Sequence, residues 1–171
     1  MKNIKIGSIS YSPGYGDMLG GVHSSSLERD KQGKWICVCR DSNTRCDPTV
    51  ITVFSVSEEK VEELEDFIAE NDFLSLGDRP QSELFLTDYS PWSYRICYEA
   101  LPPEENKRGY CSIMQFREYT EKDKELLNEM KSRFASLKGE KISETVEKPK
   151  NGFGFAEKGL FSGLRKGGNK E

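Results

Sequence analysis

The pattern of hydrophobic and polar positions changes its period within one stretch of the chain. Residues 50–56 form a β-branched and aromatic run, VITVFSV, which is typical of a buried strand. From Ser57 onward, apolar residues recur at helical spacing and acidic residues fill the positions between them. Ser57 is a favourable N-cap residue, and two glutamates follow it where carboxylates stabilise the helix dipole. The stretch therefore predicts a strand leading into a helix at 57–71, which packs its apolar stripe on a sheet and keeps its carboxylates in solvent.

Alternation of apolar and polar residues predicts further strands on both sides of this unit. They cover residues 3–11, 21–29, 34–41, 84–86, 92–99 and 110–116. The clearest alternation, in 92–99, puts three aromatic side chains and an isoleucine on one face: Trp92, Tyr94, Ile96 and Tyr98. A second helix is predicted to begin after Thr120, with Asp123 as its capping-box partner, and to end at Gly139.

The strands 21–29 and 34–41 are predicted to form a hairpin. The residues between them, Asp30-Lys31-Gln32-Gly33, are typical of a type I turn followed by a bulge with Gly33 in the left-handed conformation. This turn sets four pairs of residues opposite each other: His23 and Asp41, Ser25 and Cys39, Leu27 and Cys37, and Arg29 and Trp35. A two-residue turn would shift the register by one and send every side chain to the other face.

Strands in hairpins with the helices set apart indicate an α+β domain. We expect a mainly antiparallel sheet of six to seven strands with both helices packed on one face. This domain is predicted to span residues 1–139. Residues 140–171 are predicted to be a linker and a basic C-terminal arm, in which the spacing of the apolar residues is compatible with a helix.

The composition argues against several classes of protein. The chain has 171 residues, of which 35% are hydrophobic and 32% are charged, and its mean hydropathy is -0.69. No apolar run approaches the ~20 residues of a transmembrane helix. The N-terminus has no apolar signal-peptide core, which favours a cytoplasmic protein. The five cysteines are an odd number, and in a cytoplasmic chain we expect thiols rather than a disulfide framework.

The net charge of -4 is unevenly distributed along the chain. Residues 148–171 carry six basic and two acidic side chains, so this arm has a charge of +4 and the remaining chain -8. An acidic domain argues against nucleic acid as a partner. The arm has three interpretations: an appendage without a fixed structure, a helix that binds a protein partner, and a helix on a membrane surface. The helix on a membrane surface is disfavoured because a short helix with few basic residues binds membranes weakly. The sequence makes no prediction about the oligomeric state.

Four features together resemble a known group of proteins. They are Gly20-Gly21 at the start of a polar strand, the strand and helix at 50–71, Asp88-x-x-x-Trp92 leading into an alternating strand, and the closing helix at 120–137. Over residues 3–137 the chain is similar to small uncharacterised α+β domains of Gram-positive gut bacteria. Such domains have no assigned activity, so the resemblance implies a fold and assigns no functional residue.

Two groups of residues are candidates for a cofactor or a metal. Gly14-Tyr15-Gly16 follows a strand as a dinucleotide-binding loop does, but Leu19 stands where the third glycine belongs and no helix follows. A zinc site would draw on one histidine and three cysteines: His23, Cys37, Cys39 and Cys46. Their Cys-x-Cys spacing on a flat strand is not the usual zinc-binding spacing. We therefore expect no cofactor and no metal.

The candidate catalytic residues are His23, Cys39 and Asp41, which the predicted register brings to one face. In such a trio the carboxylate orients the histidine, and the histidine deprotonates the cysteine. His23 is the only histidine, so an ordinary histidine-based mechanism must use it. Nothing in the sequence marks a pocket or an oxyanion site. The interpretation without a catalytic role is therefore a partly exposed strand histidine paired with a carboxylate across the hairpin.

The aromatic residues of strand 92–99 are the candidate binding residues. We expect this face to be core or half-core; where it is exposed, Trp92, Tyr94 and Tyr98 would form a binding surface. The first hypothesis is accordingly a non-enzymatic binding or protein-interaction module. The alternative is an enzyme that uses His23 with Cys39 or Asp41 as a nucleophile and base.

Overall fold

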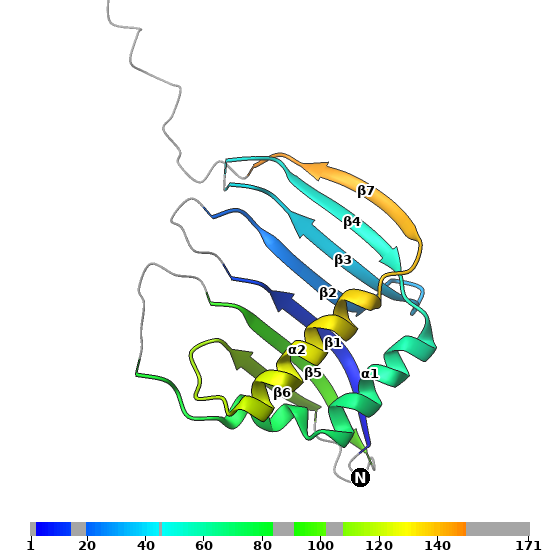
Figure 1. Ribbon diagram of the computed structural model, residues 1–171. Helices are drawn as coiled ribbons and strands as arrows, with labels where there is room; N and C mark the ends of the chain where they lie inside the picture. The colour runs from blue at the N-terminus through cyan, green and yellow to red at the C-terminus, as the bar shows by residue number, and fades with distance from the viewer. Residues whose placement is uncertain (1–2, 15–19, 45, 84–90, 102–107, 150–171) are drawn as a thin grey trace, which may run out of the picture.

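The computed structural model describes residues 3–14, 20–44, 46–83, 91–101 and 108–149. These residues form one seven-stranded sheet in the order β6-β5-β1-β2-β3-β4-β7, and every neighbouring pair is antiparallel. Both α-helices lie on the same face of the sheet (Figure 1). In chain order the elements are β1 (Asn3–Ser12), β2 (His23–Arg29), β3 (Trp35–Asp41), β4 (Thr49–Ser55), α1 (Glu58–Glu70), the 3-10 helix η1 (Phe73–Asp78), β5 (Ser93–Leu101), β6 (Arg108–Met114), α2 (Glu121–Ser136) and β7 (Lys141–Glu147). The predicted α+β fold is confirmed; the predicted strand at 84–86 lies outside the described residues.

Local sequence signals account for both helices. Ser57 caps α1 by accepting a hydrogen bond from the backbone N–H of Lys60 at 3.4 Å. At α2 the Thr120 hydroxyl and the Asp123 carboxylate exchange hydrogen bonds with each other's backbone N–H groups, which is the predicted capping box. The core lies between the helices and the sheet, and its fully buried side chains include Ile9, Leu27, Leu64, Ile68, Phe73, Ile96, Ile113 and Met130. None of the helices in the described part of the chain is both long enough and apolar enough to cross a membrane.

The predicted hairpin register is confirmed. β2 and β3 pair His23 with Asp41, Ser25 with Cys39, and Arg29 with Trp35. Gly33 has a φ of 81°, and the backbone N–H of Asp30 donates to the carbonyl of Lys34 at 2.8 Å. The glycine is needed here because a side chain strains the backbone at positive φ.

One carboxylate of α1 departs from the prediction of a solvated face. Glu65 is buried, and its Oε1 accepts a hydrogen bond from the backbone N–H of Ile6 at 2.8 Å. Its Oε2 accepts one from Lys5 Nζ, also at 2.8 Å. The pairing of β1 with β5 shifts between Ile6 and Ser8, and β2 pairs with β1 only from Ile9 onward. The N–H of Ile6 therefore needs a partner outside the sheet. Glu65 supplies that partner.

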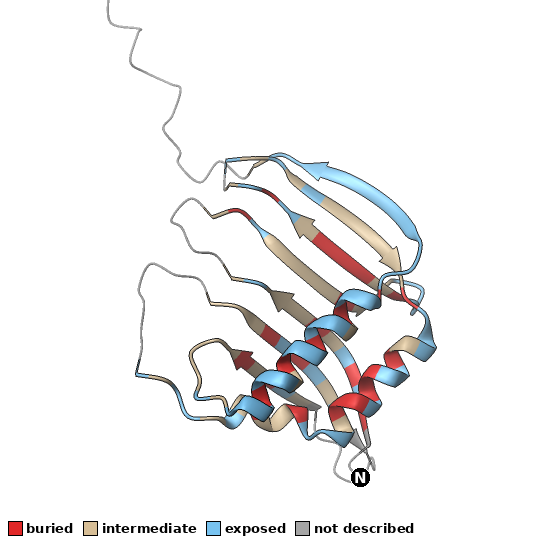
Figure 2. Cartoon of the chain, viewed as in Figure 1, coloured by how far each residue is buried: buried red, intermediate tan, exposed pale blue. Residues whose placement is uncertain are grey.

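The predicted domain boundary at residue 139 is wrong, because the sheet continues beyond it. Residues 141–147, expected to be part of a linker, form β7 and pair with β4 along its length. All seven residues of β7 are exposed (Figure 2), so no alternation of apolar and polar residues marks the strand in the sequence. Gly139 makes the approach possible: a Cβ there would come within 2.8 Å of the Ser55 carbonyl oxygen. The predicted arm from residue 150 onward lies outside the described residues.

Candidate functional site

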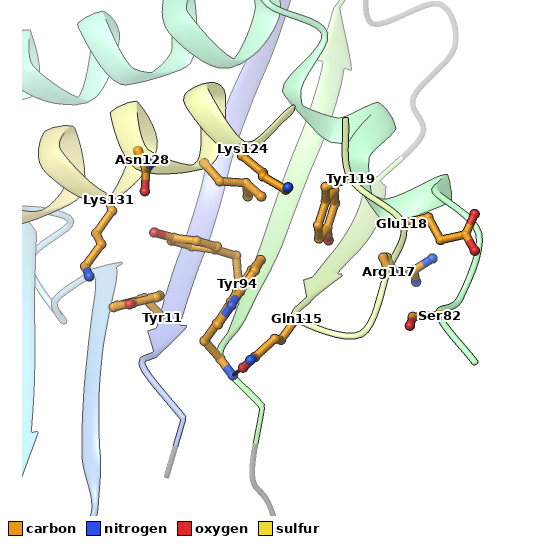
Figure 3. A pocket seen from close by; sticks show the side chains of 12 residues that line it. Tyr11, Ser82, Tyr94, Gln115, Arg117, Glu118, Tyr119, Lys124, Asn128 and Lys131 are labelled. Carbon is orange, nitrogen blue, oxygen red and sulfur yellow. Dashed lines mark hydrogen bonds between the residues drawn. The ribbon is translucent and has the colours of Figure 1, made fainter. Parts of the chain in front are cut away.

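A pocket of about 620 Å³ opens between α2 and the sheet, at the end where β1 stops and β5 begins. Figure 3 shows side chains from α2 on one side of it and side chains from the strands and the loop after β6 on the other. The lining consists of Tyr11, Ser82, Trp92, Tyr94, Gln115, Arg117, Glu118, Tyr119, Lys124, Leu127, Asn128 and Lys131. The pocket is therefore mixed, with aromatic walls and a polar rim.

Aromatic rings in mutual contact build the floor of the pocket. The rings of Tyr11 and Tyr94 stack with their centroids 4.6 Å apart, and the ring of Trp92 meets Tyr94 edge-on at 6.3 Å. Tyr119 stacks on Trp92 at 6.0 Å. Behind them, Phe134 of α2 packs edge-on against Tyr94 at 6.5 Å. Because each ring touches others, the floor is preorganised rather than assembled by a ligand.

The Tyr94 hydroxyl is the least satisfied group of this floor. The residue is 2% exposed, and its hydroxyl oxygen is buried without a hydrogen-bond partner. Burial, together with the neighbouring Tyr11, raises the pKa of Tyr94, so the phenol stays protonated at neutral pH and keeps a proton to donate. Buried polar groups nearly always have a partner. An unpartnered hydroxyl in the lining of a pocket points to a ligand or a water that completes it.

Backbone contacts fix the wall that follows β6. Gln115 is tied to Trp92 twice, through its side-chain oxygen on the Trp92 N–H at 3.3 Å and through its own N–H on the Trp92 carbonyl at 3.1 Å. The Tyr119 hydroxyl donates to the Met114 carbonyl at 2.8 Å. These bonds hold Trp92 and Tyr119 in place, so both of these residues of the aromatic floor are anchored to the backbone.

A partly buried ion pair holds the start of α2 beside the loop after β6. Arg79 donates two hydrogen bonds to Asp123, at 2.8 and 3.0 Å, and its carbonyl accepts one from Arg117 at 2.6 Å. Hydrogen bonds from Arg79 and then from Thr120 hold the pKa of Asp123 well below its usual range. The negative carboxylate also suits the first turn of a helix. The pair therefore positions α2 and Arg117 together.

The predicted catalytic trio is only partly brought together. His23 Nδ1 and Asp41 Oδ1 are 3.1 Å apart, as the register predicted, and both side chains are exposed. Cys39 is buried on the same face, and its sulfur lies 3.4 Å from the hydroxyl oxygen of Ser25. The Cys39 thiol thus lies beside the Ser25 hydroxyl, whereas His23 binds the carboxylate across the hairpin.

The Cys39 thiol has an unusual environment of its own. A hydrogen bond with Cys37, and further ones with Ser25 and Lys138, lower the pKa of Cys39. The same contact raises the pKa of Cys37, which is fully buried. The Ser25 hydroxyl and the Lys138 ammonium group thus favour the thiolate form of Cys39. Cys46 is exposed in the loop after β3, and within the described residues no three metal-ligating side chains gather into a site.

The predicted binding residues divide between two places. Trp92 and Tyr94 line the pocket, whereas Tyr98 packs at the other end of β5 against Gly109, where a Cβ would come within 2.2 Å of its ring. Sequence reasoning missed Tyr11 and the polar residues of α2. The signal for the latter was present: Lys124, Leu127, Asn128 and Lys131 follow helical spacing and share one side of the helix.

Comparisons of the chain with family models, with curated proteins and with solved structures found no match. The functional argument therefore rests on the geometry and the chemistry of the pocket.

Proposed function

We propose that this protein is a non-enzymatic binding module whose small-molecule ligand enters the pocket between α2 and the sheet. The observation that carries the proposal is the Tyr94 hydroxyl, which is buried in the lining and has no partner. A ligand acceptor placed at this hydroxyl would replace the missing hydrogen bond. Leaving such a group unpaired costs about 1–3 kcal/mol, so a ligand that pairs with it gains affinity.

The dimensions and lining of the pocket support binding. Its volume of about 620 Å³ falls within the range of small-molecule sites, which are mostly apolar with a few convergent polar groups. Phenols, amides and basic side chains make up most of the polar lining. Burial raises the pKa of all three phenols, Tyr11, Tyr94 and Tyr119, further from neutrality, which suits recognition better than proton transfer.

The two tryptophans provide a direct test of the proposal. Trp92 lines the pocket, whereas the indole N–H of Trp35 donates to Glu58 at 3.3 Å, and the Trp35 ring is covered by Arg29 at 4.2 Å. We expect a small-molecule library, screened against nitrogen-15-labelled protein by NMR, to contain compounds that shift the Trp92 indole resonance and leave that of Trp35 in place. The variant Trp92→Phe assigns the resonance. A library that moves neither indole, or moves only Trp35, would refute the proposed site.

The alternative function is an enzyme with Cys39 as its nucleophile, and the lowered pKa of this thiol is the observation that favours it. Against it, Cys39 is 5% exposed. Labelling with iodoacetamide at neutral pH separates the two functions. A binding module is expected to label first at the exposed Cys46 and Cys97, because access limits the reaction at Cys39. Preferential labelling of Cys39, abolished by Lys138→Met, would favour the enzyme.

A further inference from the structure

The charged side chains around the pocket have the opposite sign from the protein as a whole. The lining contains Arg117, Lys124 and Lys131 against the single carboxylate of Glu118, in a chain with a net charge of -4. Lys124 already pairs with Glu121 at 2.6 Å. In the described part of the chain, no hydrogen bond or ion pair engages the ammonium group of Lys131. An unpaired cation at the rim of a concave site attracts anions.

Hydrogen-bond donors gather at the same end of the pocket as Lys131. Asn128 stands three residues before Lys131 on α2, so the two side chains share one side of the helix. Figure 3 shows both reaching toward Tyr11 and the hydroxyl of Tyr94. Burial raises the pKa of Tyr11 as it does that of Tyr94, so both phenols carry a proton to donate. An ammonium, an amide and two phenols thus face the same part of the pocket.

We infer that the ligand of this pocket is an organic anion: an aromatic or apolar body with one acidic group, bound by Lys131, Asn128 and the Tyr94 hydroxyl. The inference rests on the proposed function, because it names the ligand class of the same site. The acidic group accepts a hydrogen bond from the Tyr94 hydroxyl and pairs with the Lys131 ammonium, and hydrogen bonds in which one partner is charged are the stronger kind. The body of the ligand lies against Trp92 and Leu127, the apolar part of the lining.

Two other ligand classes fit the lining less well. Aromatic residues form cages that bind quaternary ammonium groups in other proteins, and this pocket also has four aromatic residues in its lining. Here, however, the basic side chains of α2 would repel a cation. A neutral ligand would satisfy Tyr94 but would leave the exposed Lys131 ammonium at the rim without a partner. An anion satisfies both groups at once.

A matched pair of fluorescent probes tests the charge preference. The first is 8-anilinonaphthalene-1-sulfonate, and the second is N-phenyl-1-naphthylamine, which has the same aromatic body without the sulfonate. We expect Lys131→Gln to weaken binding of the sulfonate about fivefold or more, and to change binding of the neutral probe less than about twofold. Lys31→Gln, in the exposed turn between β2 and β3, makes the same change in net charge away from the pocket and is the control. Shifts of the Trp92 indole resonance confirm that each probe occupies the pocket.

A second variant separates the ligand's hydrogen bond from the ring contacts. Tyr94→Phe keeps the aromatic packing and removes only the unpartnered hydroxyl, so the free protein is expected to unfold at the same temperature as the wild type or a higher one. It should nevertheless bind the sulfonate more weakly. A variant that is as stable as the wild type yet weaker in binding cannot owe its loss to unfolding.

The outcomes distinguish the inference from the proposed function. Equal affinity for both probes, with no effect of Lys131→Gln on either, would overturn the anion preference and leave the pocket a binding site. An equal loss in Lys131→Gln and Lys31→Gln would also overturn it, because a general charge effect would then explain the result. If both probes leave the Trp92 resonance unmoved, the proposed function itself is contradicted, and the inference falls with it.

Discussion

Replacement of Glu65 by alanine is expected to lower the free energy of unfolding more than replacement of an exposed glutamate on the same helix. In the variant Glu65→Ala the backbone N–H of Ile6 stays buried and loses the acceptor that now lies 2.8 Å away. A buried donor without its partner costs about 1–3 kcal/mol, and the bond lost is one to a charged group. The pair with Lys5, whose side chain is 55% exposed, adds at most about 1 kcal/mol. Together these give an expected loss of about 2–4 kcal/mol in the free energy of unfolding.

Urea unfolding followed by tryptophan fluorescence measures this loss, and two variants control for its cause. Glu65→Gln keeps an oxygen for the Ile6 N–H and should recover most of the stability. Glu62→Ala removes an exposed carboxylate from the same helix and should change stability by less than about 0.5 kcal/mol. In hydrogen exchange, the Ile6 amide should lose protection in Glu65→Ala alone. If Glu65→Ala were as stable as Glu62→Ala, the carboxylate would not be the partner that holds the irregular part of β1.

Three further predictions follow from single features of the fold. Gly33→Ala should lower the free energy of unfolding in urea by about 1 kcal/mol. A Cβ at this position would meet no atom within 4 Å, so the penalty comes from the φ of 81° alone. An unchanged unfolding midpoint would contradict this prediction. The lowered pKa of Asp123 means that its carboxylate contributes stability above its unfolded pKa, and that this contribution is lost as the pH falls below about 4. Asp123→Asn should therefore be less stable than the wild type at pH 7, and a gap that failed to narrow toward pH 2 would refute the linkage. Truncation after Lys148 should leave the free energy of unfolding within about 1 kcal/mol of that of the full chain. Truncation after Gly139 removes β7 and should lower the free energy of unfolding further. Equal unfolding midpoints for the two truncations would contradict a structural role of β7.

Features that depend on neighbouring residues were readable from the sequence. The hairpin register followed from the Asp30–Gly33 turn, because turn type and loop length fix which residues face each other. The caps at Ser57 and Thr120 followed from the need of the first helical N–H groups for side-chain acceptors. The alternation in β5 assigned Tyr94 to the inner face, since successive side chains on a strand point to opposite sides.

Three features were decided only by the tertiary structure. Glu65 belongs by its spacing to the acidic side of α1, and its carboxylate is buried against β1, where Ile6, 59 residues away in sequence, presents an N–H to it. β7 carries no periodic signal, because an exposed edge strand needs no buried face and is held by its hydrogen bonds to β4. The pocket gathers residues from β1, from the start of β5, from the loop after β6 and from α2. No spacing within a single element encodes such a gathering, because it depends on where α2 crosses the sheet.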